Sequence, residues 1–308
     1  MDEPLSPWHD GERAVHRRLG IAEQIEPIGG RNIRPFMPDQ HRAFFAQLPF
    51  LVAGSVDRAG RPWASILSGR PGFAASPDPR LLQVAAWPVA GDPLAEALVV
   101  GGRIALLGIE LPTRRRNRLN GRIVAADGDG FAVAAEQSFG NCPQYIHLRY
   151  YGALRRVPAA AEPFTALPDD ARALIARSDT CFVASATPPG AGGEPGSADV
   201  SHRGGREGFI GIDEAGVLAI PDYRGNRYFN TLGNLALNPR AGLLFIDFAS
   251  GDLLQLTGTT EIVWDGPEVE AFAGAQRLWR LAPTAGNWLR GAFPLRMTDG
   301  EPAPQLSE

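Results

Sequence analysis

An internal repeat is the feature of this sequence that most restricts its fold. Residues 63–73, WASILSGRPGF, align without a gap on residues 199–209, DVSHRGGREGF, which start 136 positions later. Residues 104–111 match residues 241–248 with an offset of 137. The first pair of blocks aligns Ser65 with Ser201, Gly69 with Gly205, Arg70 with Arg206, Gly72 with Gly208 and Phe73 with Phe209. Two separate blocks with nearly one offset predict a tandem duplication of one module, whose copies can pack about a pseudo-twofold axis as two subunits do.

Composition and charge are ordinary and exclude little. The chain has 308 residues, 44% of them hydrophobic and 21% charged, which is typical of a soluble protein with room for two cores. No apolar run is long enough to span a membrane, and the N-terminus, MDEPLSPWHD, lacks the basic and apolar regions of a signal peptide. We therefore expect a cytoplasmic protein without a membrane partner.

Lysine is absent, and all 30 basic residues are arginine. The chain can therefore form no Schiff base on lysine and has no phosphate-binding lysine of the kind found in nucleotide-binding loops. An anion must be held by arginine, backbone N–H groups, hydroxyl groups or helix N-termini.

The two cysteines, Cys142 and Cys181, have neither metal-ligand spacing nor a disulfide pattern. We interpret them as buried thiols and predict no metal site. Cys142 could act as a nucleophile with His147 as its base, but the sequence contains nothing that brings the two side chains together.

The pattern of apolar residues and turns divides the chain into five parts. Residues 1–37 are predicted to be a helical extension with an amphipathic helix near residues 9–19, followed by a Gly/Pro-rich stretch. Residues 38–154 form the first module, 155–170 a linker rich in Pro and Ala, 171–265 the second module, and 266–308 a C-terminal helix and tail. Expected helices cover residues 40–47, 92–99, 169–176, 229–237 and 267–281, and expected strands include 81–86, 103–111, 181–186, 217–222, 241–248 and 252–264. Short strands with Gly-rich turns favour a mainly β protein with short helices and small barrels over a Rossmann sheet.

Several segments together resemble a known family. GNRYFNTLGNLALNPRAGLLFIDF at residues 225–248 and SADVSHRGGREGF upstream of it are similar to the cofactor-binding segments of FMN-binding split-barrel proteins related to pyridoxamine 5'-phosphate oxidase. In the first half, GRPWASILSGRPGF, LPTRRRNRLNGRI and SFGNCPQYIHLR resemble a subgroup with duplicated modules. The likeness covers nearly all of residues 38–265 and implies two tandem split β-barrels related by an internal pseudo-twofold.

The resemblance implies FMN as cofactor, with its phosphate site in the second module. A phosphate dianion needs several converging donors, and arginine is well suited to supply them. The implied cofactor-binding residues are Ser201, His202, Arg203, Asn226, Arg227, Asn230 and Thr231. The expected residues of the pocket wall are Trp63, Arg116, Asn120, Asn141 and Tyr145. Because Leu67 stands opposite Arg203 in the repeat, we expect one FMN per chain.

The sequence also departs from the vitamin-B6 oxidase pattern. It lacks the lysine of the phosphate-binding strand, and Asn230 and Thr231 stand near the place of the Ser-Arg-Lys triplet. The resemblance therefore implies FMN binding but not pyridoxamine phosphate as the substrate.

The basic run TRRRNR at residues 113–118 permits a nucleic-acid interface. The chain carries a net charge of −4, and no aromatic stacking platform adjoins the run. We therefore predict no nucleic-acid partner, and expect these arginines to bind an anion or to pair with acidic side chains of the chain itself.

The function that the resemblance implies is an FMN-dependent oxidoreductase acting on a small molecule, with NAD(P)H or a reductase as electron donor. The alternative is a non-catalytic protein on the same barrel that binds flavin or haem or senses redox state. No catalytic residue can be assigned from the sequence. Either a monomer with an internal pseudo-dimer or a homodimer fits the duplication.

Overall fold

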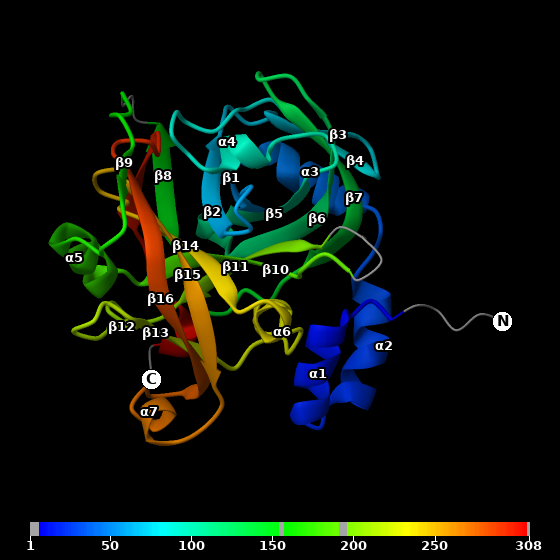
Figure 1. Ribbon diagram of the computed structural model, residues 1–308. Coiled ribbons are helices and arrows are strands. Elements are labelled where there is room, and N and C mark those ends of the chain that lie inside the picture. The colour runs from blue at the N-terminus through cyan, green and yellow to red at the C-terminus, as the bar shows by residue number, and fades with distance from the viewer. Residues whose placement is uncertain (1–5, 154–156, 191–195, 307–308) are drawn as a thin grey trace.

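The computed structural model describes residues 6–153, 157–190 and 196–306. Two β modules lie side by side, and short helices cover their outer faces (Figure 1). The chain is mainly β with short helices, as the sequence predicts. Within the described residues no helix is both long and apolar enough to cross a lipid bilayer.

The first module is built on a seven-stranded antiparallel sheet. Its strands follow the order β2-β1-β5-β6-β7-β4-β3. Their bounds are β1 Phe50–Val56, β2 Pro62–Ser68, β3 Ala74–Asp78, β4 Leu81–Val84, β5 Arg103–Glu110, β6 Arg115–Ala126 and β7 Phe131–Gly140. Short turns across residues 57–61 and 127–130 join β1 to β2 and β6 to β7 as antiparallel hairpins.

The second module repeats this sheet strand for strand. Its order is β11-β10-β14-β15-β16-β13-β12, and β9 adds to β16. The bounds are β9 Glu162–Phe164, β10 Thr180–Ala186, β11 Ala198–Gly204, β12 Gly211–Ile212, β13 Leu218–Tyr223, β14 Arg240–Ile246, β15 Leu253–Val263 and β16 Ala275–Leu289. The register also repeats, because Ala53 faces Ser65 as Val183 faces Ser201. The predicted duplication is confirmed.

The shared Gly-Arg-x-Gly-Phe sequence forms the same turn in both modules. A Cβ atom at Gly69 would lie 2.6 Å from Phe73, and one at Gly205 would lie 2.4 Å from Phe209. Each phenylalanine also donates its backbone N–H to the carbonyl three residues earlier. The glycine is needed because the phenylalanine ring folds back over it into the core.

The helices also correspond between the modules. Helices α3 (Asp39–Gln47) and α5 (Asp169–Arg177) precede β1 and β10, and α4 (Leu94–Ala97) and α6 (Asn230–Leu237) precede β5 and β14. Each of α3 and α5 follows a proline whose fixed φ suits a helix start. The predicted helices in these four places are confirmed, although α4 is shorter than expected.

The modules meet through equivalent strands, as two subunits of a dimer would. Strand β2 contacts β14 of the second module, and the corresponding β11 contacts β5 of the first. A Cβ atom at Gly242 would lie 2.4 Å from the Pro62 carbonyl oxygen, so the backbones nearly touch here. One buried cluster contains side chains of both modules, including Phe50 and Phe182. This reciprocity is the pattern of an internal pseudo-twofold axis.

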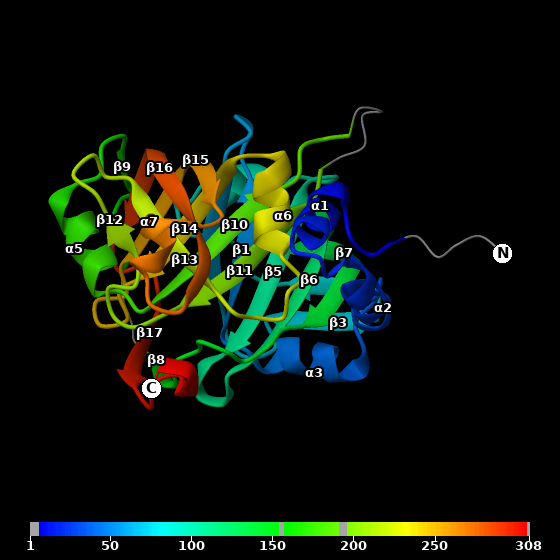
Figure 2. The same ribbon diagram turned by 90° about the horizontal axis from the view of Figure 1, so that it is seen from below.

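The N-terminal extension forms a helical hairpin that packs on the second module. Helix α1 (Asp10–Arg18) lies against α6, and α2 (Ala22–Asn32) returns beside it (Figure 2). The expected helix at residues 9–19 is confirmed. Most of the Gly/Pro-rich stretch after it is α2, which contains Pro27.

The predicted C-terminal helix over residues 267–281 is wrong. Only α7 (Pro267–Glu270) is helical there, and the following residues form β16, which pairs with both β15 and β13. Leu278 and Trp279 are neighbours and both fully buried, because both faces of this central strand are covered. The second sheet therefore extends to Leu289, beyond the expected module boundary at residue 265.

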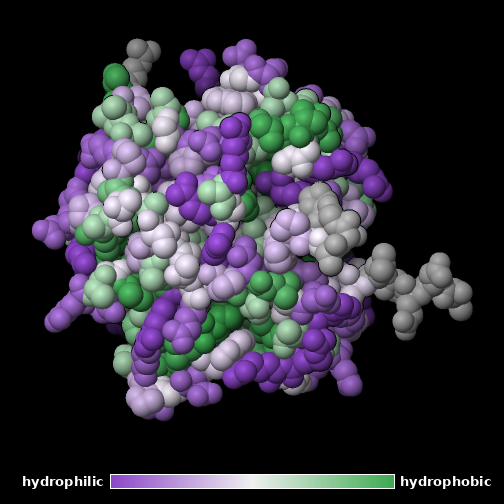
Figure 3. All heavy atoms as spheres, in the orientation of Figure 1, coloured by the Kyte–Doolittle hydropathy of each residue, from purple (hydrophilic) through white to green (hydrophobic). Residues whose placement is uncertain are grey.

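Two further strands join the ends of the modules. Strand β8 (Arg149–Ala153) pairs with β17 (Leu295–Asp299), and short 3-10 turns, η1 (Leu111–Thr113) and η2 (Pro304–Leu306), lie nearby. On the face shown in Figure 3, hydrophobic residues form small patches among hydrophilic ones. Such scattering is normal for the surface of a globular protein.

Candidate functional site

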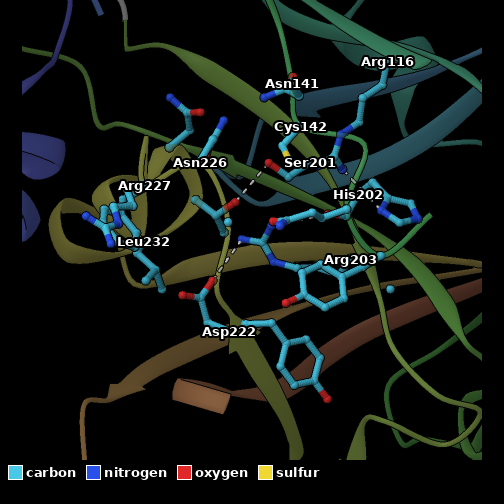
Figure 4. Close-up of a pocket in the computed structure, with 18 of the residues that line it drawn as sticks. Arg116, Asn141, Cys142, Ser201, His202, Arg203, Asp222, Asn226, Arg227 and Leu232 are labelled. Carbon is cyan, nitrogen blue, oxygen red and sulfur yellow. Dashed lines mark hydrogen bonds and ion pairs between the residues drawn. The ribbon is translucent and has the colours of Figure 1, made fainter. Parts of the chain in front are cut away.

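A polar pocket lies where the two modules meet, between β6, β11 and the start of α6 (Figure 4). The first module contributes Arg116, Arg118, Asn141, Cys142, Gln144 and Tyr145. The second contributes Ser201, His202, Arg203, Asp222, Tyr223, Asn226, Arg227, Phe229, Asn230 and Thr231. Its enclosed space is about 100 Å³. That is less than the roughly 300–1,000 Å³ of a pocket that buries a whole drug-sized ligand, so it suits a compact polar group.

Arg118 organises the floor of the pocket. It alternates with Arg116 along β6, so both side chains leave the same face of the strand. Its guanidinium pairs with Asp199 at 2.9 Å, and it donates to Ser201 Oγ at 2.7 Å and to Asn230 Oδ1 at 2.8 Å. Because it is only 3% exposed, this arginine is a fixed link between the modules.

Helix α6 begins at the pocket without a side-chain cap. The preceding residue, Phe229, has φ 58°, and Arg227 has φ 64°, a left-handed conformation that residues other than glycine seldom adopt. The first N–H groups of the helix have no intrahelical acceptor, and the helix dipole favours an anion there. Thr231 Oγ1 donates to Ser201 Oγ at 3.2 Å, so two hydroxyl groups lie beside this helix end. Left-handed residues of this kind cluster at functional sites.

Arg116 is a half-buried cation without a carboxylate partner among the described residues. Its Nη1 lies 3.4 Å from His202 Nδ1, and its Nε is buried without a hydrogen bond. Burial, together with the neighbouring charges of Arg118 and Arg203, lowers the pKa of Arg116 to about 9. A buried charge left without a counterion is costly, so the pocket favours an anionic ligand.

The pocket holds more positive than negative charge. Asp222 is shared by Arg277 at 2.9 Å and Arg203 at 3.7 Å, and burial raises its pKa. Arg227 is exposed and forms no ion pair in the described part of the chain. The four arginines of the wall therefore exceed its nearby aspartates, Asp199 and Asp222, by two charges.

His202 is a neutral imidazole at the back of the pocket. It is 3% exposed, and burial and the charge of Arg116 lower its pKa well below the usual value. If Arg116 donates to Nδ1, the ring proton is on Nε2, which is buried without a partner. On the opposite wall, Tyr145 stacks on Tyr223 with ring centroids 5.2 Å apart.

The structure brings most of the predicted site residues together. All seven residues predicted to bind the cofactor line the pocket, as do Arg116, Asn141 and Tyr145. Cys142 also lines it, but the predicted alternative of a Cys142–His147 pair has no support, because His147 Nε2 contacts the Gly205 carbonyl at 2.7 Å instead. No group of three or more metal-ligating side chains is present in the described ranges.

Trp63 and Asn120 do not line this pocket, so their placement in its wall was wrong. Trp63 is buried at the contact between the modules, where its Nε1 donates to Asp57 at 3.0 Å. Asn120 shares the strand face of Arg116 but lies four residues further along β6, a distance of about 13 Å. There it contacts Gln137 and borders a different hollow beside the N-terminal residues.

Sequence reasoning did not assign Arg118, Asp222 or Tyr223 to the pocket, although it expected the arginines of residues 113–118 to bind an anion or pair with acidic side chains, as Arg118 does with Asp199. A signal for Arg118 was present, since the period of a strand places Arg116 and Arg118 on one face. Asp222 and Tyr223 had no such signal. They end β13, which is far from β11 in the strand order, and only the tertiary fold brings Asp222 within 3.7 Å of Arg203.

The comparisons with known proteins agree with this architecture. Residues 167–289 match the family model for pyridoxamine 5'-phosphate oxidase. The second module belongs to this family. No curated protein matches the chain.

Solved structures with a similar fold include three bacterial proteins. HutZ of Vibrio cholerae, described as a haem storage protein, is 16% identical, with a TM-score of 0.28 over 41% of this chain and 95% of that one. HupZ of Group A Streptococcus is 12% identical, with a TM-score of 0.27 over 42% and 92%. A protein of Clostridium acetobutylicum related to general stress protein 26 is 18% identical, with a TM-score of 0.27 over 42% and 92%.

Proposed function

We propose that the chain is an FMN-dependent oxidoreductase that binds one FMN in the pocket between its modules. The observation that carries this proposal is Arg116, half-buried and without a carboxylate partner among the described residues, beside the uncapped start of α6. A phosphate carries about two negative charges near neutral pH, which balances the excess of arginine over aspartate in the pocket.

The residues present fit a phosphate group. Ser201 and Thr231 supply hydroxyl groups, Arg116, Arg203 and Arg227 supply guanidinium groups, and α6 supplies backbone N–H groups. The enclosed space suits the phosphate rather than the whole cofactor, so the rest of the flavin would lie toward the open side of the pocket, with Asn141 and Tyr145.

When bound, FMN supplies hydride or electron transfer to a small molecule, with NAD(P)H or a reductase as donor. The chain supplies binding and electrostatics. Arg118 fixes Ser201 and Asn230, and the arginines hold positive charge close to the ligand. The sequence departures from the vitamin-B6 oxidase pattern argue against pyridoxamine phosphate as the substrate.

The absorption spectrum of the purified chain, followed by anaerobic addition of NAD(P)H, tests this proposal. We expect a flavin spectrum that bleaches on reduction. A protein that binds neither added FMN nor inorganic phosphate would contradict it.

A second candidate is a haem-binding protein on the same fold. The observation that favours it is His202, whose imidazole is neutral and buried and whose Nε2 has no partner. Nε2 can ligate iron in the tautomer that carries its proton on Nδ1, in which Nδ1 no longer accepts from Arg116. Neutral imidazole is a common haem ligand. A haem spectrum that is lost in His202→Ala would decide for this candidate, and a flavin spectrum would decide against it.

A further inference from the structure

Helix α1 of the N-terminal extension packs against α6 with almost no space between the backbones. A Cβ atom at Gly11 would lie 2.0 Å from the Gly233 carbonyl oxygen, and one at Gly233 would lie 2.6 Å from Glu12. Glycine at both positions therefore allows a crossing that larger residues would prevent. The close crossing brings the side chain of Glu12 to the first residue of α6.

Glu12 is the outer end of a chain of hydrogen bonds that leads into the pocket. It is 3% exposed, and its two carboxyl oxygens accept from Asn230 Nδ2 and from the His9 N–H. Asn230 Oδ1 in turn accepts from Arg118, which donates to Ser201. The carboxyl group thus orients the amide that holds the Arg118 guanidinium.

Within the described ranges of the chain, no cation is left to balance a charge on Glu12. The groups that face it are His9 on its own helix, Asn230 on α6, Asp199 on β11 and Arg118 on β6. Arg118 is already paired with Asp199, and burial lowers the pKa of His9 to about 4, so that ring is neutral. Burial raises the pKa of Glu12 to about 8.

We propose that Glu12 is a positioning residue of the anion site, and that its loss of a proton weakens anion binding. The proposal rests on the proposed function only in taking the pocket to bind a phosphate-bearing ligand. A protonated Glu12 orders Asn230 without adding charge. An ionised Glu12 makes the buried group of Glu12, Asp199 and Arg118 negative at the wall of a site that must attract an anion.

The test compares the chain with its Glu12→Gln variant, because glutamine is neutral at every pH and can still accept from Asn230. Dissociation constants for FMN and for inorganic phosphate are measured from about pH 6.5 to about pH 9, across the pKa of Glu12. We expect equal constants for the two proteins at the low end, and about tenfold weaker binding by the parent at the high end. The ligand and Arg116 titrate in the same way in both proteins. The ratio of the two dissociation constants therefore reports only the effect of Glu12.

Glu23→Gln is the matched control, because Glu23 is exposed on α2. Its constants should equal the parent's at every pH. A parent-to-Glu12→Gln ratio that does not change with pH would overturn the inference while leaving the proposed function intact. A failure of both probes to bind any of these proteins would overturn both proposals.

A second experiment measures the pKa of the Glu12 carboxyl group directly. By linkage, a bound anion that is repelled by ionised Glu12 must raise the pKa of Glu12. A carboxyl carbon NMR titration, with the signal assigned from Glu12→Gln, should show this rise when phosphate is added. An unchanged pKa on saturation with phosphate would contradict the proposal, even if Glu12→Gln destabilised the fold.

Discussion

Ser201 and Ser65 occupy equivalent positions in the two modules, but Ser201 lines an open pocket and Ser65 is buried. In the second module Ser201 accepts from Arg118 at the floor of an open pocket. In the first, Ser65 accepts from Gln255, which follows Arg118 by the repeat offset of 137 residues. Ser65 then donates to Asp92 at 2.6 Å, and both Ser65 and Gln255 are fully buried.

The difference shows that a few substitutions are enough to replace a cationic pocket by a packed polar contact. Glutamine is neutral and shorter than arginine, and Gln255 also donates to the Ala64 carbonyl at 3.0 Å, so it needs no anion. Leu67 occupies the place of Arg203 and belongs to the apolar core of its module. One module thus keeps a cationic pocket, whereas the other uses the same strands for packing.

Cofactor stoichiometry is the strongest test of this comparison. We expect one FMN per chain after saturation, because the position at Ser65 has neither space nor arginine. Cofactor extraction and protein quantification measure the ratio. Two flavins per chain would show that the closed position opens, and the comparison would then fail.

Arg118→Gln would give the open site the residue of the closed one. It leaves Asp199 buried without its ion partner, so we expect a loss of about 3–5 kcal/mol in the free energy of unfolding, with loss of FMN binding. Denaturant unfolding measures the first effect, and flavin titration the second. Adding Asp199→Asn should restore most of the stability but not the binding, and a stable, FMN-binding single variant would contradict the role of Arg118.

Asp92 makes the closed site dependent on pH. Burial raises its pKa from 3.8 to about 6, so the folded state holds the proton more tightly than the unfolded chain. Its contribution to stability is therefore complete below about pH 4 and is lost as the pH rises through about 6. Asp92→Asn should raise the free energy of unfolding by about 2–3 kcal/mol at pH 7 and hardly at all at pH 4. The same gain at both values would show that Asp92 does not titrate in this way.

Arg116→Gln should separate stability from binding in the open site. We expect FMN affinity to fall by about tenfold to a hundredfold, because one charge-assisted hydrogen bond is lost. The cofactor-free protein should become slightly more stable, because a half-buried cation without a carboxylate partner is removed. Calorimetry of the cofactor-free and the FMN-bound protein measures both the gain in stability and the loss of affinity. A variant that loses stability without FMN would indicate that Arg116 has a partner in the free protein.

Arg227→Ala should have a smaller effect, at the lower end of the same range, because Arg227 is exposed. Arg203→Ala should behave similarly, since Arg203 already lies near Asp222. Arg58→Ala is the control, because Arg58 is exposed in the hairpin turn of the first module. Equal FMN affinity in Arg227→Ala, Arg58→Ala and the parent would show that the cofactor is held elsewhere.

The duplication in the sequence also includes the helix that precedes each sheet. PDQHRAFFAQ, starting at Pro38, aligns with PDDARALIAR, starting at Pro168, at an offset of 130. These segments are α3 and α5, which begin the two modules. The loop between β10 and β11, residues 187–197, is longer than the loop between β1 and β2, residues 57–61. The offset therefore changes from 130 to 136 between the first block of the repeat and the second.

The sequence by itself determined the repeated strands, the Gly-Phe turns and most of the cationic residues, because alternation, turn glycines and arginine-only charge are local properties of the chain. Only the tertiary structure decided that β16 is a strand, that Trp63 packs between the modules, and that Arg118 of one module orders Ser201 of the other. Those outcomes depend on which surfaces meet across the pseudo-twofold axis. Contacts between residues far apart in the chain leave no pattern in the sequence around either residue.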